Sequence, residues 1–284
     1  MTLRYKKNSN LLPILNSLRL QIFETSYLEK GNDWHFKHIV SPFNRLYFVK
    51  GGDASVRPSF DVGAYTALEP GKIYLIPLGR SFDYICQSHI EKLYIHFRLE
   101  VIEGLDLFEL MRSNSATAVV TPLELKSHRP ISEWRSLFNK AYESEEIADV
   151  LKFDGQLKEL LASNVSFSLS SISALILHQK KYAEELQFIK QNLRHGLSIK
   201  DVSMISGKAE AKFSRDFRRD FGFSLKSYLL RSLTRKAQEK LWLSSEPINQ
   251  IAAELGFDDV YYFSRFFKKY SGKTPSEFRQ DSGL

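Results

Sequence analysis

Several features that mark whole classes of protein are scarce or missing in this sequence of 284 residues. It contains a single cysteine, Cys86, which excludes an intramolecular disulfide framework and is typical of a reducing compartment. No run of about 18 apolar residues occurs, so we expect no membrane span. The N-terminal stretch pairs Lys6 and Lys7 with an apolar run that polar residues soon interrupt. We therefore expect no signal peptide and a cytoplasmic location.

The positive charge of the chain is concentrated in its last third. Residues 181–284 contain 19 Lys/Arg against 13 Asp/Glu, a balance of +6 out of a total of +7. Residues 1–180 contain 21 Lys/Arg against 20 Asp/Glu, a balance of +1. A mildly basic solvated surface would not need such asymmetry, which favours a nucleic-acid-binding C-terminal domain.

Up to about residue 115 the sequence has the signals of β-structure, because aromatic and β-branched runs alternate with glycine and proline turns. We expect strands at residues 45–49, 65–68, 72–76, 81–86 and 92–99, with Gly51-Gly52 closing the first. Within 92–99, apolar residues alternate with Lys92, Tyr94, His96 and Arg98, so the two sets occupy opposite faces. The pattern favours a small sandwich or barrel and leaves open which face of this strand points inward.

Two segments near the C-terminus repeat each other at an offset of 50 positions. Residues 213–222 and 263–272 share a Phe-Ser-Arg start, a second Phe, a basic pair and a final Gly. Upstream of each copy, a short amphipathic segment ends at Gly207 or Gly256. A repeat of this length is one supersecondary unit used twice, and we interpret it as two helix-turn-helix units.

Helical spacing in this region predicts the individual helices. We expect reading helices at about 209–220 and 260–270 and a long connecting helix at 227–243. Ser198 is a good N-cap for the helix before the first glycine, and Asp258 or Asp259 is expected to cap the helix that begins at 260. By the same spacing four phenylalanines belong to the core, namely Phe213, Phe217, Phe263 and Phe267.

Residues 181–284 closely resemble the DNA-binding domain of the AraC/XylS family of transcription regulators. The stretch from Pro247 to Arg279, with Leu255-Gly256-Phe257 and Tyr262-Phe263-Ser264-Arg265 inside it, matches the family signature almost throughout. The first copy departs from it, because Ser206 and Lys208 flank its glycine and Leu225 stands where the family often has proline. We therefore expect the first reading helix to pack less tightly or to need DNA to order fully.

The resemblance implies which side chains face DNA. Its base-facing positions fall on Ala211, Ser214 and Arg215 in the first helix and on Val260, Tyr261, Ser264 and Arg265 in the second. Positions near phosphates fall on Lys212, Arg218, Arg219, Lys268 and Lys269. An arginine can read guanine through two hydrogen bonds, whereas Ala211 and Val260 offer only apolar contact. The alternative for Arg215 and Arg265 is an ion pair with a neighbouring acid, Asp216 or Asp258.

The N-terminal half resembles the sensor domain of AraC-type regulators, a cupin-like jelly roll. The resemblance is carried by residues 45–52, 69–77 and 93–97. Where such barrels bind a ligand, it lies inside against aromatic and polar side chains, and a sugar is the candidate effector here. The candidate contacts are Tyr94, His96, Trp34, His38, Arg45 and Tyr47. Packing in the core is the alternative for His96 and Trp34.

Helical spacing also predicts two helices, at 131–142 and 151–161, between the two halves. The fold class is then α+β with two domains: a cupin-like β-barrel with a helical extension at 1–165, a linker at 166–180, and an all-α domain with two helix-turn-helix units at 181–284. In many AraC-type regulators such helices form the dimer interface, so we expect a homodimer; the alternative is that they only pack on the barrel.

The histidine pattern argues against an enzyme. Catalytic cupins resemble one another in a His-x-His pair, whereas His35 and His38 are separated by two residues and His89 lies far from His96. We expect no metal and no cofactor. The sequence thus predicts a sequence-specific DNA-binding transcription regulator, of the activating kind commoner in the family, with promoter DNA, a small-molecule effector and RNA polymerase as partners. The alternatives are a cupin-type enzyme with an accessory helical domain and a regulator whose barrel only dimerises.

Overall fold

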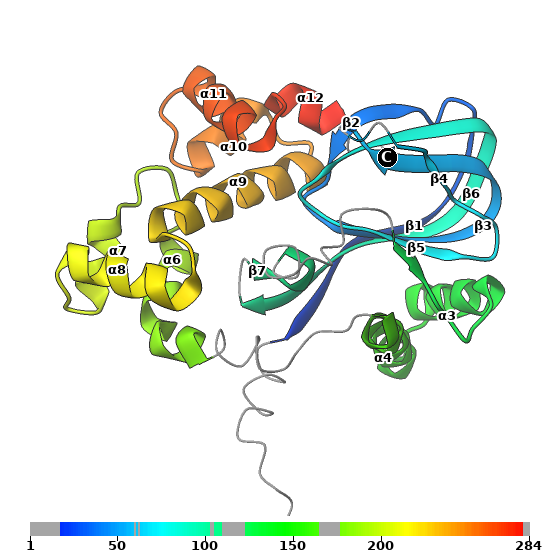
Figure 1. The fold of residues 1–284 in the computed structure, drawn as a ribbon, viewed down its shortest axis with the longest axis horizontal. Helices are drawn as coiled ribbons and strands as arrows, with labels where there is room; N and C mark the ends of the chain where they lie inside the picture. The colour runs from blue at the N-terminus through cyan, green and yellow to red at the C-terminus, as the bar shows by residue number, and fades with distance from the viewer. Residues whose placement is uncertain are drawn as a thin grey trace, which may run out of the picture. The chain divides into compact units, whose positions relative to one another are not determined.

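The computed structural model describes residues 18–59, 61, 63–102, 105–109, 123–164 and 177–280. They fall into two compact units (Figure 1): a β-rich unit that includes residues 19–100 and 123–164, and a helical unit that includes residues 177–280. The N-terminal apolar run and most of the linker predicted at 166–180 lie outside the described residues. Within the described ranges, no helix is both long and apolar enough to cross a bilayer.

The β-rich unit is an antiparallel sheet with the strand order β1-β6-β3-β5-β8, in which β2 and β7 also pair with β6 and β4 pairs with β3. Its strands are β1 (Arg19–Gly31), β2 (Phe36–Val40), β3 (Asn44–Pro58), β4 (Thr66–Ala67), β5 (Ile73–Ile76), β6 (Ser81–Ile102), β7 (Leu105–Asp106) and β8 (Leu123–Leu125). Helices α3 (Ile131–Glu143) and α4 (Ile147–Asn164) complete the unit and confirm the two helices predicted between the halves.

The glycine pair Gly51-Gly52 bends a strand instead of ending it, so the prediction of a strand end there is wrong. Strand β3 continues through both glycines, and the register with β6 shifts on either side of them, at Val49/Gly51 and Gly52/Ala54. Gly52 has φ +108°, and a Cβ at this position would collide with the backbone carbonyl of His89. The pair therefore forms an irregularity at which two long strands bend together.

Strand β6 is likewise one strand of 22 residues, not the two short strands predicted at 81–86 and 92–99. It pairs with β1 along Arg19–Gly31 and with β3 on both sides of the glycine irregularity. Figure 1 shows β3 and β6 curving across the whole unit. This bend brings residues that precede Gly51 opposite residues that follow it.

Both faces of the 92–99 segment are buried, and the position of helix α3 shows which face points outward. The apolar face is covered by helix α3, because the Phe48 ring beside Leu93 lies 5.0 Å from the Trp134 ring. We call it the outer face. The inner face carries Lys92, Tyr94, His96 and Arg98, and their exposed fractions are between 0% and 7%. The sequence indicated a polar face, but the fold buries it.

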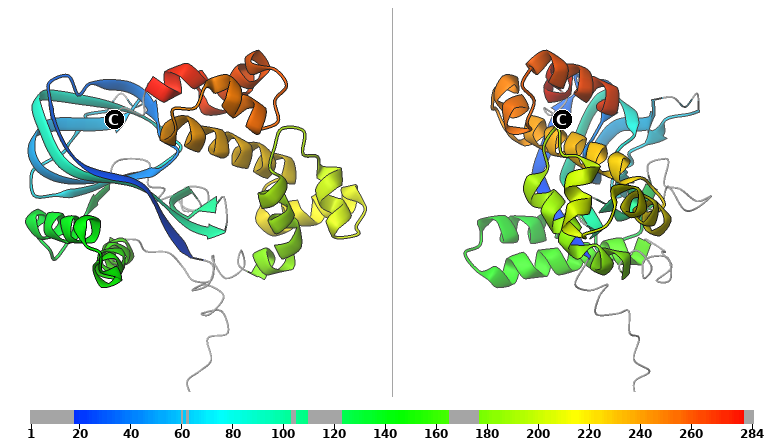
Figure 2. Two further views of the ribbon diagram at one scale, coloured as in Figure 1. Left: turned by 180° about the vertical axis from the view of Figure 1, so that it is seen from behind. Right: turned by 90° about the vertical axis from the view of Figure 1, so that its left-hand side faces the viewer.

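The helical unit contains α6 (Ala183–Asn192), α7 (Ile199–Ile205), α8 (Glu210–Phe221), α9 (Leu225–Leu243), α10 (Ile248–Glu254), α11 (Val260–Ser271) and α12 (Pro275–Gln280). Ser198 caps α7 through a capping box with Asp201, as the sequence predicted for the cap. Gly222 and Gly272 end α8 and α11 in the left-handed conformation. Figure 2 shows α9 as one continuous helix between the α7–α8 pair and the α10–α11 pair.

The two copies of the repeat bury their phenylalanines equally well. Phe213, Phe217, Phe263 and Phe267 are all 0–1% exposed, which confirms that they are core residues. The burial of these side chains therefore shows no difference between the copies, and the expectation that the first reading helix packs less tightly or needs DNA to order fully stays a prediction. The copies differ instead at the cap of the reading helix and at the turn glycine.

Candidate functional site

Helices α8 and α11 each present a polar outer face. None of the residues predicted to face DNA is buried. Exposed positions are Ala211, Lys212, Arg215, Arg218, Arg219, Tyr261, Arg265, Lys268 and Lys269, and half-buried positions are Ser214, Val260 and Ser264. The structure thus gathers them on the sides of the two helices that point away from the phenylalanine core.

Arg215 and Arg265 are available to a ligand outside the chain. Neither makes an ion pair with a described residue, and the carboxylate of Asp216 instead accepts a hydrogen bond from Arg219 at 3.0 Å. Arg265 lies over the ring of Tyr262 on the preceding turn, with its guanidinium carbon 5.9 Å from the ring centroid. The alternative interpretation, an ion pair for each arginine, does not describe this structure.

Arg219 differs from the other candidate phosphate contacts. Its guanidinium pairs with Asp216 at 3.0 Å and with Asp220 at 2.9 Å, although its side chain remains 64% exposed. Because two carboxylates already balance its charge, Arg219 has less net positive field to offer a phosphate than the unpaired Arg218. We therefore rank Arg219 below the other predicted phosphate contacts.

Asp220 is the anchor of this end of α8. Its carboxylate, only 6% exposed, accepts hydrogen bonds from Lys181 Nζ at 2.5 Å, the Tyr182 hydroxyl at 2.8 Å and Arg219 Nε at 2.9 Å. Burial alone would raise the pKa of Asp220, but these three hydrogen bonds outweigh it and hold the pKa far below its usual range. The first reading helix is thereby tied to the segment that precedes α6.

The two reading helices begin differently. Asp259 caps α11, because its carboxylate accepts hydrogen bonds from the backbone N–H groups of Tyr261 at 2.9 Å and Tyr262 at 3.1 Å. This decides between the two capping candidates. Helix α8 follows Ala209, which provides no side-chain cap. The first turn of α11 is therefore held by a side-chain cap that α8 lacks.

In the β-rich unit, three of the six candidate effector contacts meet two residues that were not candidates. We call Trp34, Arg45, Tyr47, Tyr84 and Lys92 the inner cluster. Arg45 donates a hydrogen bond to the Tyr84 hydroxyl at 2.8 Å, and the Trp34 ring lies 5.3 Å from the Tyr84 ring. The Lys92 ammonium nitrogen lies 3.3 Å from the Tyr47 ring centroid and 4.1 Å from that of Trp34. All five are at most 2% exposed.

Tyr94 and His96 lie on the same inner face and share one acid. The Tyr94 hydroxyl donates to Glu24 at 2.7 Å, and His96 Nδ1 lies 2.9 Å from the other oxygen of that carboxylate. Burial lowers the pKa of His96 to about 4 in spite of the attraction of Glu24, so the imidazole is neutral at pH 7. Across the strands, His96 is the partner of Arg45 and Tyr94 is the partner of Tyr47, so both adjoin the inner cluster.

His38 is the candidate that the structure does not bring to this group. Its side chain is 58% exposed, and its backbone N–H donates to Asp83 at 2.8 Å. It also has a left-handed φ of 57°, which is uncommon for residues other than glycine. His38 therefore lies on the surface of the unit and not in its interior.

Comparison with known proteins identifies the family. A helix-turn-helix domain model matches residues 202–281. The multiple antibiotic resistance protein MarA of Escherichia coli is 33% identical over 33% of this chain and 74% of MarA. The chain belongs to the AraC/XylS family. It is a DNA-binding transcription regulator.

Other relatives of this AraC-family regulator extend the comparison. The Msm operon regulatory protein of Streptococcus mutans is 22% identical over 96% of this chain and 98% of its own length. The arabinose operon regulatory protein of Escherichia coli is 35% identical over 44% of this chain and 46% of that protein. ToxT from Vibrio cholerae has a TM-score of 0.50 at 14% identity and covers 92% of this chain and 99% of ToxT, which is a likeness of fold. The matching relatives are thus regulators.

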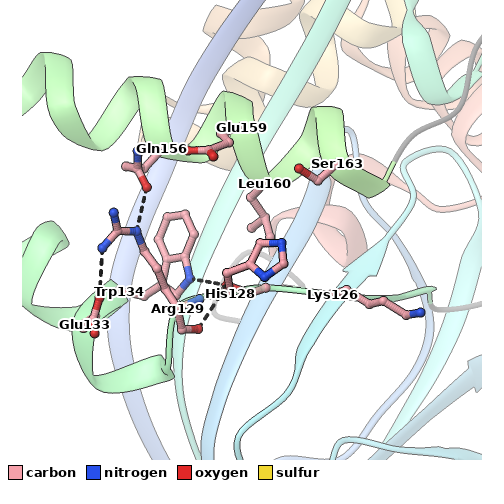
Figure 3. Close-up of a pocket in the computed structure, with 10 residues that line it drawn as sticks. Lys126, His128, Arg129, Glu133, Trp134, Gln156, Glu159, Leu160 and Ser163 are labelled. Carbon is pink, nitrogen blue, oxygen red and sulfur yellow. Dashed lines mark hydrogen bonds and ion pairs between the residues drawn. The ribbon is translucent and has the colours of Figure 1, made fainter.

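A surface hollow of about 300 Å³ lies between α4 and the segment that leads into α3 (Figure 3). The polar side chains that line it form hydrogen bonds with one another. Arg129 donates to Gln156 at 2.6 Å and to Glu133 at 2.9 Å, and the Trp134 indole donates to Ser127 at 3.0 Å. These hydrogen bonds connect α4 to the start of α3, so we interpret the hollow as part of the contact between the two helices and not as a ligand site.

Sequence reasoning missed three members of the inner face in this AraC-family regulator. Lys92 was placed on the polar face of its strand but was not considered as a contact, although it shares that face with Tyr94 and His96. Tyr84 gave no signal, because it reaches Arg45 only through the bend of β3 and β6. Glu24 lies on β1, a strand that was not predicted. No group of three or more metal-ligating side chains occurs in the described part of the chain.

Proposed function

We propose that the α7–α8 and α10–α11 pairs are two helix-turn-helix units that read DNA together. The family assignment and the polar outer faces of α8 and α11 support this. Helix α9, with 19 residues, joins the pairs and would hold them at a set spacing. Two successive major grooves lie about 34 Å apart. Engaging both at once would bend the DNA, at a cost of about 1–6 kcal/mol.

We assign base contacts to seven residues, namely Ala211, Ser214, Arg215, Val260, Tyr261, Ser264 and Arg265. Phosphate contacts are assigned to Lys212, Arg218, Lys268 and Lys269, with Arg219 in a weaker role. Arg215 and Arg265 carry this assignment, because they are exposed at equivalent positions of both copies and no described acid neutralises either. An arginine in that state can donate two parallel hydrogen bonds to a guanine.

We further propose that residues 1–165 form a cupin-like jelly roll that binds a small-molecule effector inside, with 166–180 as the linker to the DNA-binding domain at 181–284. The buried aromatic and polar side chains of the inner face support this. A sugar is one candidate, since a relative is named for the arabinose operon. ToxT, which shares the fold, has been solved bound to a naphthalenyl butenoic acid. A thermal-shift screen without any stabilising metabolite would count against sensing.

A homodimer through α3 and α4 is the assembly that we propose. These helices leave large apolar side chains exposed, with Tyr142 at 77%, Ile147 at 68% and Leu151 at 61%. An apolar group of this kind is typical of a protein interface. Sedimentation velocity checks the proposal, and a monomer at every concentration would contradict it.

The regulator is proposed to be a cytoplasmic activator that contacts RNA polymerase at a promoter, in line with the commoner role in its family. A reporter that carries the promoter region next to its own gene measures the sign of regulation. Higher expression after deletion of the regulator would identify a repressor.

The experiment for DNA reading compares Arg265→Ala with Lys268→Ala, which remove one positive charge each from the same helix. The DNA site is first selected from a random pool with the wild-type protein. Fluorescence anisotropy would then follow binding to this selected site and to every single-base variant of it, at several salt concentrations. Arg265→Ala should lose about 1–3 kcal/mol on the selected site and relax specificity at one position. Lys268→Ala should weaken binding to all sequences alike and lower the salt slope by about one.

The same comparison applies to the first copy, with Arg215→Ala against Lys212→Ala. For Arg215→Ala, the relaxed base preference should appear in the half of the DNA site that Arg265→Ala leaves unaffected. If the arginine variants keep wild-type specificity, or lose affinity uniformly as the lysine variants do, the assignment of these arginines as base readers is wrong.

A further inference from the structure

The inner cluster contains a buried amine, Lys92, that has no hydrogen-bond acceptor among the described residues. Lys92 is 0% exposed, and no described residue accepts a hydrogen bond from its ammonium nitrogen. The Arg45 guanidinium, also buried in the inner cluster, repels the protonated form of Lys92. A buried cation with unused donors is costly, so folded proteins normally pair such groups.

The aromatic rings around Lys92 do not replace a hydrogen-bond acceptor. Tyr47 and Trp34 face the ammonium nitrogen at 3.3 and 4.1 Å, close enough for cation–π attraction. That attraction offsets only part of the cost of removing an ammonium group from water. The Trp34 indole N–H, also buried, has no hydrogen-bond partner among the described residues either. Two buried N–H donors of the inner cluster, an ammonium and an indole, therefore lack an acceptor among the described residues.

We infer that the interior of the β-rich unit binds a small molecule through an oxyanion, a carboxylate or a phosphoryl group, with Lys92 and Arg45 as its counter-charges. Trp34 and Tyr47 would enclose the carbon skeleton beside that group. An oxyanion accepts several hydrogen bonds at once and meets both needs of the site, a negative charge and acceptors for Lys92 and Trp34. The inference rests on the proposed sensing function and gives its effector a charge.

A neutral sugar fits the same site less well. Its hydroxyl groups can accept hydrogen bonds from Lys92, but they leave the repulsion between Lys92 and Arg45 uncompensated. Burial and this repulsion hold the pKa of Lys92 well below its usual range. A bound anion would instead favour the protonated amine, so it draws a proton towards Lys92. Proton uptake on binding distinguishes an oxyanion from a neutral ligand.

The test is isothermal titration calorimetry of the full-length protein with four probes at equal ionic strength: acetate, glucuronate, glucose 6-phosphate and glucose. The variants are Lys92→Met, which keeps the volume and removes the amine, and the control Lys50→Met. Lys50 lies on the surface with its side chain 48% exposed. We expect at least one anionic probe to bind the wild type and the control roughly 30-fold or more tighter than Lys92→Met.

The outcomes separate the ligand sources and the two proposals. Binding of glucuronate or acetate alone identifies a carboxylate, and binding of glucose 6-phosphate alone identifies a phosphoryl group. If glucose binds the wild type and Lys92→Met equally while no anion binds, sensing stands and the oxyanion inference is wrong. If no probe binds either protein, both the sensing proposal and the oxyanion inference are overturned for this site.

A second measurement does not depend on the variant folding well. Titration of the wild type in buffers of different ionisation enthalpy at pH 8 reports the protons exchanged on binding. The inference expects net proton uptake when an anionic probe binds. Binding of an anion without proton uptake, and with equal affinity in Lys92→Met, would show that the anion does not meet Lys92.

Discussion

Replacing Asp220 by asparagine tests whether the first reading helix depends on one buried carboxylate. Two of its three hydrogen-bond partners are well exposed, Lys181 at 42% and Arg219 at 64%. Since exposed partners regain water when released, each of these ion pairs contributes about 0–1 kcal/mol. The third partner, Tyr182, is 0% exposed, and a hydrogen bond to a charged group contributes about 1.5–3 kcal/mol.

Asparagine can still accept a hydrogen bond from the Tyr182 hydroxyl, so only the charge-assisted part of that bond is lost. The expected loss of stability for Asp220→Asn is therefore about 2 kcal/mol. Urea unfolding followed by circular dichroism at 222 nm measures it, since most helices belong to the unit that contains Asp220. Asp216→Asn is the matched control on the same helix. Its carboxylate pairs with Arg219 alone, so it should lose less than about 1 kcal/mol.

The pH dependence of the difference supplies an independent check. The pKa of Asp220 is lower in the folded than in the unfolded state, so its stabilisation is present above the unfolded pKa, about 3.9, and is lost as the pH falls towards the folded pKa. The difference in free energy of unfolding between the wild type and Asp220→Asn should thus be constant above about pH 5 and shrink below about pH 4. A gap no larger than that of Asp216→Asn, or equally large at pH 3 and pH 7, would refute this account of α8.

Two further predictions concern the turn glycines of both copies and the cap of α11. Gly256→Ala should cost about 2 kcal/mol and Gly207→Ala about 1 kcal/mol in thermal unfolding. Both glycines have positive φ, but only at Gly256 would a Cβ meet close neighbours, at 3.1 Å from Arg194 and 3.2 Å from His195; equal costs would contradict this. Asp259→Ala removes the cap of α11 and should cost about 1 kcal/mol in the same assay, and no change in stability would mean that the cap is not needed.

The role of the C-terminal half followed from the sequence because its signals are local. Helical spacing, a turn glycine and a repeated Phe-Ser-Arg start all act within about a dozen residues, and they placed Phe213 and Phe263 in the core and Arg215 and Arg265 outside. Local signals also placed Ser198 at a helix cap. They did not show that Asp220 would gather Lys181 and Tyr182, since those residues lie about forty positions away and meet only when the helices pack.

The β-rich half was less predictable because its strands pair over long distances. The sequence by itself determined that one face of 92–99 is polar and that Gly51-Gly52 is a special position. It could not show that the glycines bend β3 and β6 together, which carries Tyr84 onto Arg45 and encloses Lys92 against Trp34. A hydrogen-bonded pair 39 residues apart leaves no local pattern. Tertiary structure alone decided that the polar face became a buried interior that contains Lys92 and Arg45.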